Sequence, residues 1–95
     1  MIPLCAPHIR NQEWERIKDC VDTEWVSYAG KYVEQFEQDL ASFTGAQHAA
    51  VTISGTSALH LALIVAGVKQ DDEVILPALS FVAPANAIRY QGAWP

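Results

Sequence analysis

The chain has 95 residues, of which 51% are apolar, and its formal net charge is −5. This length fits one small domain or part of a larger one, and the apolar content excludes a disordered chain. The acidic balance, without a cluster of lysines and arginines, argues against a nucleic-acid partner and against a basic membrane-binding surface. No apolar run reaches the roughly 18 residues that cross a bilayer. No signal peptide is recognisable and Cys5 and Cys20 lack metal-ligand spacing, so we expect a reduced, cytoplasmic setting.

The first half of the chain predicts an extended arm followed by two helices. Residues 1–10 hold two prolines and predict the arm, after which Asn11 can cap the first helix. The second helix is expected over residues 31–44, with a left-handed C-cap at Gly45. Each helix has an apolar stripe with spacings of three and four: Trp14, Ile17 and Val21 in the first, and Val33, Phe36, Leu40 and Phe43 in the second.

The second half alternates predicted strands and helices. Residues 48–53 ("HAAVTI") and 74–76 ("VIL") are short, apolar and rich in β-branched side chains, which predicts two buried strands. Residues 57–67 predict a helix that is apolar all round and therefore buried, which Gly67 ends. A last helical segment is expected to open at Ser80, with Pro84 in its first turn.

This alternation indicates an α/β fold with a parallel β-α-β element. Two strands do not make an independently stable sheet, and a helix that is apolar on every side needs more cover than the other elements supply. We therefore infer an N-terminal piece of a larger α/β protein. The alternative is a small chain that finds its cover in a partner subunit.

Two loops follow the predicted strands at the same edge of the sheet, where parallel sheets carry their functional loops. In the first, Gly55 lets a ligand approach the backbone, while Thr56 and Ser57 add hydroxyls to the unpaired N–H groups of a helix start. Such a turn can bind a phosphate, although it matches neither the Walker A nor the GxGxxG pattern, and an ordinary capped turn is the alternative. In the second, Phe81 can stack on a planar ring or serve as a core aromatic. Together the loops indicate a flat phosphorylated cofactor.

The histidines add no site. His8, His48 and His60 fit no metal-ligand spacing, so we expect no metal, and His60 reads as a satisfied core histidine.

Three stretches, "WVSYAGKYVEQFEQDLASFTG", "SGTSALHLAL" and "DDEVILPALSFVAPANAIRYQGAWP", resemble in order and spacing the N-terminal part of the DegT-type (DegT/DnrJ/StrS) sugar aminotransferases. These are fold-type I enzymes that depend on pyridoxal 5′-phosphate (PLP). The resemblance implies the N-terminal portion of a three-layer large domain, with residues 1–30 as arm and first helix and residues 31–95 as the start of the PLP-binding domain. It also implies that Gly55, Thr56 and Ser57 hold the PLP phosphate and that Phe81 stacks on the pyridine ring.

The resemblance implies that the full-length protein transfers an amino group from an amino acid, typically glutamate, to a keto-sugar attached to a nucleotide, and acts as a homodimer. Pro84 departs from the family, which has Thr or Ser there, so a cofactor contact at this position is in doubt. The Schiff-base lysine of the family comes after this stretch, and none of Lys18, Lys31 and Lys69 matches it. We therefore expect no catalytic residue in the chain and no activity of the chain alone.

Two other hypotheses stay open. One is a small α/β module that binds a phosphorylated ligand without PLP chemistry, and the other is a truncated, non-catalytic or assembly piece. The segment from Trp25 to Lys31 is expected near the mouth of the active site, with no role assigned.

Overall fold

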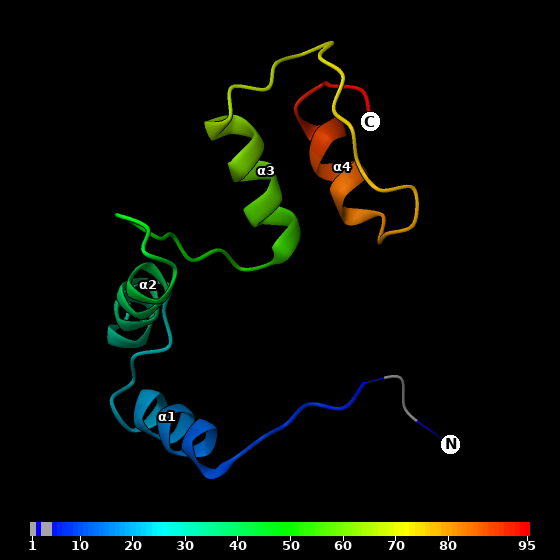
Figure 1. The fold of residues 1–95 in the computed structure, drawn as a ribbon. Helices are drawn as coiled ribbons and strands as arrows, with labels where there is room; N and C mark the ends of the chain where they lie inside the picture. The colour runs from blue at the N-terminus through cyan, green and yellow to red at the C-terminus, as the bar shows by residue number, and fades with distance from the viewer. Residues whose placement is uncertain (1, 3–4) are drawn as a thin grey trace. The chain divides into compact units, whose positions relative to one another are not determined.

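The computed structural model describes residue 2 and residues 5–95, which form four helices. In chain order these are α1 (Asn11–Asp22), α2 (Lys31–Thr44), α3 (Gly55–Val65) and α4 (Ala83–Tyr90) (Figure 1). The chain divides into two compact units, Met1–Ala46 with α1 and α2, and Gln47–Pro95 with α3 and α4. Among the helices described, none has the length and apolar character needed to cross a membrane.

Helix α1 forms where it is predicted, but Arg10 and not Asn11 occupies its N-cap position. The backbone N–H of Arg10 donates to the carboxylate of Glu13 at 2.8 Å, which fixes the start of the helix one residue earlier than expected. The described part of the predicted arm, residue 2 and residues 5–10, has no helix or strand, and residues 1, 3 and 4 lie outside the described residues.

Helix α2 confirms its predicted range and its predicted cap. Gly45 follows the helix with a φ of 73°, in the left-handed region that a side chain disfavours. The N-terminal cap is Gly30, in an extended conformation.

Helix α3 begins two residues before the predicted helix, with Ser54 as its N-cap. Gly67 follows the helix with a φ of 84°, as its predicted role at the helix end requires. The expectation of burial all round is wrong for this structure, because no residue of α3 is buried and Leu61 and Ile64 are 43% and 51% exposed. The physical reason is that α4 is the one described helix that packs against α3.

Helix α4 confirms the prediction of Pro84 in the first turn, but it starts three residues later than expected. Val82 and not Ser80 occupies the N-cap position, and the N–H of Asn86 donates to the Val82 carbonyl at 3.0 Å. That bond is the first helical bond of the segment, which explains the later start.

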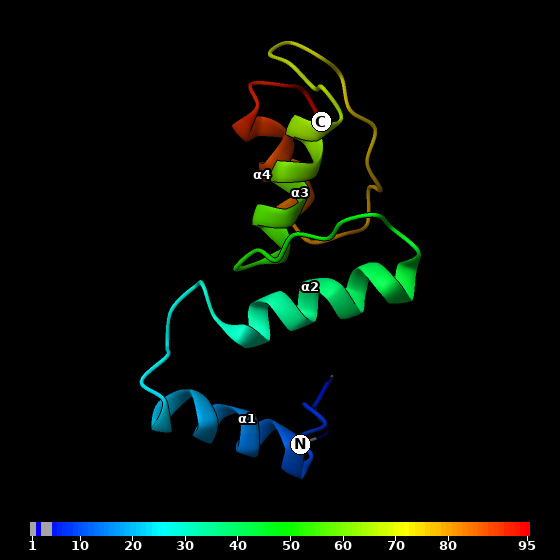
Figure 2. The ribbon, with the colours of Figure 1, turned by 90° about the vertical axis from the view of Figure 1, so that its left-hand side faces the viewer.

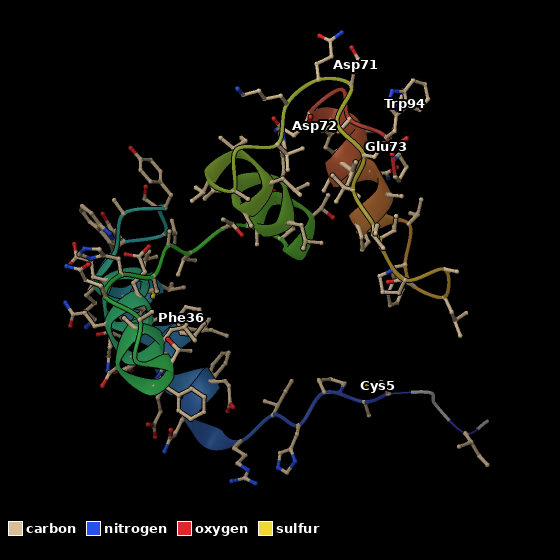
Figure 3. The ribbon with its side chains drawn as sticks, turned by 45° about the horizontal axis from the view of Figure 1, so that its top comes forward. Cys5, Phe36, Asp71, Asp72, Glu73 and Trp94 are labelled. Atoms are coloured by element: carbon tan, nitrogen blue, oxygen red, sulfur yellow. The ribbon has the colours of Figure 1, made fainter. Side chains whose placement is uncertain are left out.

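The two predicted strands do not form: within the part of the chain described here, residues 48–53 and 74–76 have no strand structure. One parallel bridge joins Glu73 and Trp94 (Figure 3). The N–H of Trp94 donates to the Asp72 carbonyl at 2.7 Å, and the N–H of Val74 donates to the Trp94 carbonyl at 2.8 Å. A strand needs a paired neighbour along its whole length, whereas here each segment contributes one paired residue. In place of the predicted α/β sheet there is a single parallel bridge between the segments before and after α4.

Helices α3 and α4 pack together and start at the same end of their unit, as the two views agree (Figures 1 and 2). The rings of His60 and Tyr90 meet edge to face with centroids 5.6 Å apart, which gives the half-buried His60 a packing partner. The buried apolar residues among those described are Ala87, Ile88 and Ala93.

Candidate functional site

The predicted phosphate loop forms the first turn of α3, with Gly55, Thr56 and Ser57 as its first three residues. Ser54 fixes this turn, because its Oγ accepts a hydrogen bond from the N–H of Ser57 at 3.2 Å and lies 3.0 Å from the Ser57 Oγ. The hydroxyl of Thr52 donates to the Ser54 carbonyl at 2.9 Å and braces the approach to the helix. The N–H of Ser57 is therefore hydrogen-bonded within the turn. Helix geometry leaves the N–H groups of Gly55 and Thr56 without an acceptor inside the helix, facing out of its start.

The space and charge around this turn fit an anion. A Cβ built on Gly55 would have nothing within 4 Å, so the backbone there is open to a ligand. The first turn of α3 carries no acidic side chain, so nothing on the helix opposes the partial positive charge of its N-terminus. A phosphate fits this donor set: two backbone N–H groups, the Thr56 hydroxyl and the hydroxyl pair of Ser54 and Ser57.

Phe81 precedes α4 by two residues and its side chain is 88% exposed. It is not a core aromatic of this unit. Helices α3 and α4 start at the same end of the unit, so the segment that leads into α4 and the turn at the start of α3 lie at that end (Figures 1 and 2). The roles of Gly55, Thr56, Ser57 and Phe81 at a cofactor stay predictions.

Two of the three lysines, Lys18 and Lys31, form ion pairs. Lys31 Nζ lies 2.6 Å from Asp19 Oδ2, and this carboxylate raises the pKa of Lys31 above its ordinary value. A nucleophilic lysine needs the opposite shift, because only the neutral amine attacks. Lys18 pairs with Asp22 one turn along α1, and the backbone N–H of Lys69 donates to Asp72 in the turn after α3.

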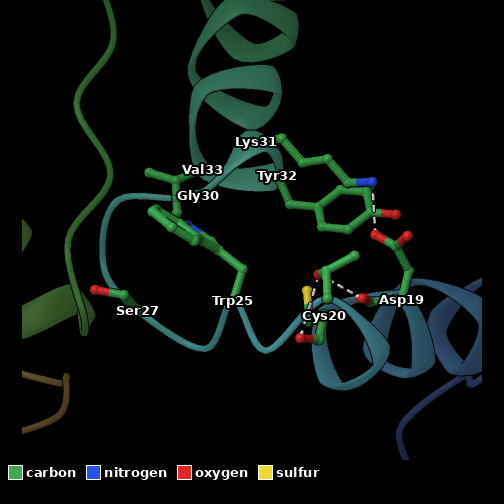
Figure 4. Close-up of a pocket in the computed structure, with 9 residues that line it drawn as sticks. Asp19, Cys20, Trp25, Ser27, Gly30, Lys31, Tyr32 and Val33 are labelled. Atoms are coloured by element: carbon green, nitrogen blue, oxygen red, sulfur yellow. Dashed lines mark hydrogen bonds and ion pairs between the residues drawn. The ribbon is translucent and has the colours of Figure 1, made fainter.

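A pocket that the sequence did not predict lies in the unit of α1 and α2 (Figure 4). Its volume is about 410 Å³, and its lining includes Asp19, Trp25, Gly30, Lys31 and Tyr32. The segment from Trp25 to Lys31 was expected near an active site, but the parts played by Asp19 on α1 and Tyr32 on α2 were missed. The sequence signal that could have indicated this pocket is Trp25 five residues before Gly30, in a stretch that breaks the helical period.

No metal site appears among the residues that the structure describes, since none of their histidine, cysteine, aspartate and glutamate side chains form a group of three or more that could hold an ion. The two cysteines are free, Cys5 exposed and Cys20 half-buried at the pocket.

Solved structures that share this backbone include a putative sugar aminotransferase and a sugar dehydratase with bound PLP. A putative sugar aminotransferase from Streptococcus pneumoniae in its PMP form has a TM-score of 0.88 and 32% identity, and the match covers 99% of this chain and 24% of that chain. The E. coli GDP-4-keto-6-deoxy-D-mannose-3-dehydratase with bound hydrated PLP has a TM-score of 0.84 and 26% identity, covering 96% of this chain and 25% of that chain. The backbone is therefore that of the PLP-dependent aminotransferase fold.

Residues 7–95 match the DegT/DnrJ/EryC1/StrS aminotransferase family, and the chain belongs to this family. It is 42% identical over 94 residues to the GDP-perosamine synthase of Escherichia coli O157:H7, covering 99% of this chain and 26% of the relative. It is 37% identical over 94 residues to the UDP-4-amino-4-deoxy-L-arabinose–oxoglutarate aminotransferase of Shewanella sediminis, covering 99% of this chain and 24% of the relative. The chain thus spans about a quarter of the length of the curated relatives it matches.

Proposed function

We propose that this chain is the N-terminal, cofactor-binding part of a PLP-dependent aminotransferase that moves an amino group from an amino acid, glutamate, to a nucleotide-linked keto-sugar. The observation that carries the proposal is the family match over residues 7–95, taken together with the open, uncharged turn at the start of α3. Family membership without that turn would leave the cofactor without a phosphate seat in this part of the protein.

In this proposal the N–H groups of Gly55 and Thr56 and the hydroxyls of Thr56 and Ser57 hold the cofactor phosphate. Ser54 acts on the turn by holding Ser57 at 3.2 Å. Phe81 orients the cofactor by covering one face of its ring. PLP, when bound, supplies an electron sink that makes a proton on the amino donor's α-carbon removable.

The remaining machinery belongs to other parts of the polypeptide. Lys31 is not prepared for covalent catalysis, since it is paired with Asp19 and its pKa is raised. We propose that the Schiff-base lysine follows this stretch, that residues 31–95 begin an α/β large domain after an N-terminal arm and helix over residues 1–30, and that the whole enzyme is a cytoplasmic homodimer.

The relatives support the proposed substrate class. The GDP-perosamine synthases of E. coli O157:H7 and Vibrio cholerae are 42% and 43% identical to the chain, whereas the GDP-sugar dehydratase of E. coli is 26% identical. This ranking supports amino transfer over dehydration. The UDP-4-amino-4-deoxy-L-arabinose–oxoglutarate aminotransferase of Shewanella sediminis is 37% identical, which supports a GDP-linked sugar over a UDP-linked one.

The test uses the whole enzyme with PLP, glutamate and GDP-4-keto-6-deoxymannose. The proposal predicts that 2-oxoglutarate forms in step with an aminated GDP-sugar, both read by mass spectrometry. A dehydrated sugar without nitrogen, or no turnover of any nucleotide-linked keto-sugar, contradicts it.

A further inference from the structure

A side-chain hydrogen bond joins the segment before α3 to the first turn of that helix. The Thr52 hydroxyl donates to the carbonyl oxygen of Ser54 at 2.9 Å. The same oxygen accepts the N–H of Ala58 at 3.0 Å, which is the first helical bond of α3. A carbonyl oxygen has two lone pairs, so these two bonds fill its acceptor capacity. The Ser54 carbonyl is therefore held both by the helix and by the segment that precedes it.

The bond from Thr52 is not needed to cap the helix. Ser54 already caps α3 with its own side chain, whose Oγ accepts the N–H of Ser57 at 3.2 Å. The Thr52 hydroxyl satisfies no N–H of the helix, because it is itself the donor and the Ser54 carbonyl already has a helical partner. What the bond changes is the freedom of the peptide group whose oxygen it holds.

That peptide group also carries the N–H of Gly55. The Ser54 carbonyl and the Gly55 N–H belong to one planar peptide unit, so a restraint on the direction of the oxygen also restrains the direction of the N–H. Gly55 lacks a Cβ, which leaves this unit freer to rotate than any other residue would. Helix ends also fray, so the helical bond from Ala58 is a weak restraint by itself. A second bond, from a side chain outside the helix, holds the peptide unit in place.

The Gly55 N–H is one of the donors that the proposed phosphate seat uses. A Cβ built on Gly55 would have nothing within 4 Å, so a phosphate can approach this N–H closely. Hydrogen bonds to an anion are strong, and they weaken steeply when donor and acceptor are misaligned. Donation by Thr52 to the peptide oxygen also polarises the peptide group, which makes its N–H a stronger donor. The Thr52 hydroxyl therefore affects both the alignment and the strength of the Gly55 donor.

We infer that Thr52 is a positioning residue for the cofactor phosphate: its hydroxyl, through the Ser54–Gly55 peptide group, aims the Gly55 N–H at the phosphate of PLP. In this assignment Thr52 touches neither the phosphate nor the ring. The inference rests on the proposed function, and it adds a residue from the segment before α3 to the groups that hold the cofactor. Loss of the hydroxyl should weaken a ligand only if that ligand carries the phosphate.

The test compares the dissociation constants of PLP and of pyridoxal, which lacks the phosphate, measured with the whole enzyme. Thr52→Val keeps the branched side chain and removes the hydroxyl. We expect this variant to bind PLP about 3- to 10-fold more weakly, as loss of one hydrogen bond does, and to bind pyridoxal as the wild type does. Thr52→Ser keeps the hydroxyl and should retain most of the affinity for PLP.

Thr44→Val is the matched control. The Thr44 hydroxyl donates to the Leu40 carbonyl at 2.8 Å, so the same substitution removes the same kind of bond in the other unit. It should leave both dissociation constants unchanged. A Thr44→Val enzyme that loses as much affinity for PLP as Thr52→Val does would overturn the inference.

A Thr52→Val enzyme that binds PLP as tightly as the wild type also overturns it. Equal weakening of PLP and pyridoxal does the same, because it marks a general loss of structure. If Thr52→Val does not fold, Thr52→Ala is judged by the same comparison. The proposed function is scored separately. A wild type that prefers PLP to pyridoxal, with the preference unchanged in Thr52→Val, keeps the phosphate seat and loses this inference. A wild type that does not distinguish the two ligands contradicts the seat itself.

Discussion

The indole ring of Trp25 lies against the backbone of Gly30, so closely that a Cβ on Gly30 would be 2.7 Å from Cδ1 and 2.9 Å from Nε1 of that ring. No backbone strain requires glycine here, because Gly30 is in an extended conformation with a φ of −140°. Glycine is required for a steric reason: the Trp25 indole, in the connection between α1 and α2, packs against the N-cap residue of α2.

Gly30→Ala should therefore push Trp25 out of place. Overpacking of this kind costs about 1 to 3 kcal/mol, and we expect the lower end because the indole is half exposed and can move. Thermal denaturation should show a lower midpoint, and the tryptophan emission should shift as the hydrogen bond to Ala29 is lost. An unchanged midpoint together with unchanged emission would show that the contact is absent in solution.

Phe81→Ala should weaken retention of PLP without weakening the fold of its own unit. The side chain is 88% exposed, and substitutions at such positions change stability by about 0.5 kcal/mol or less. Dialysis of the whole enzyme followed by absorbance of the remaining cofactor gives the occupancy. Ile75→Ala, at a fully exposed position of the same unit, is the matched control and should keep its cofactor. Equal occupancy in both variants would reject a stacking role for Phe81.

The Asp19–Lys31 pair should stabilise the α1–α2 unit over a wide pH window. The pKa of Asp19 is lowered from 3.8 by Lys31, so its contribution is present above that value and is lost as the pH falls through the lowered pKa. The pKa of Lys31 is raised from 10.5 by Asp19, so its contribution is present below that value and is lost as the pH rises through the raised pKa.

The difference in thermal midpoint between wild type and Asp19→Asn should accordingly stay constant from about pH 5 to pH 9 and shrink outside that window. Asp22→Asn removes the exposed pair with Lys18 inside α1, and it should change the midpoint little at any pH. A difference that varies between pH 6 and pH 8 would mean that another titrating group controls the effect.

The 95-residue chain expressed alone should associate or bind a hydrophobic dye. Ala87, Ile88 and Ala93 are its buried apolar residues in the part described, while side chains such as Ile75 and Phe81 are exposed. Exposed apolar surface on this scale marks interaction sites. Sedimentation and dye fluorescence measure both properties. A monomer with one cooperative thermal transition and no dye binding would contradict the expectation.

The helices of this chain were predictable because local signals define them. The stripe of α2 and the cap at Gly45 lie within one stretch of sequence, and the first turn of α3 carries its own capping serine. The turn at Gly55–Ser57, for which we propose a phosphate-binding role, also lies within this one local stretch. The boundaries that moved, Arg10 for Asn11 and Val82 for Ser80, depended on single hydrogen bonds that composition does not reveal.

The strands and the pocket could not be predicted in the same way because both depend on partners. Residues 74–76 have the composition of a strand, but among the described residues the parallel pairing is limited to Glu73 and Trp94. The pocket depends on the ion pair between Asp19 on α1 and Lys31 on α2, and on the packing of the Trp25 indole against Gly30. The periodicity of either helix does not indicate these contacts between residues of different segments.

The central claim is that the first turn of α3 is the seat of the PLP phosphate, and Gly55→Ala tests it most directly. A Cβ at Gly55 meets no protein atom within 4 Å, and alanine favours a helix by about 1 kcal/mol over glycine, so the variant should be as stable as the wild type or more stable. The measurement is the dissociation constant of PLP from the whole enzyme. We predict at least about 10-fold weaker binding, because the methyl group occupies the space that the phosphate needs and because displacing one charged hydrogen bond is worth roughly 1.5 to 3 kcal/mol. An unchanged dissociation constant in a stable Gly55→Ala enzyme would contradict the account.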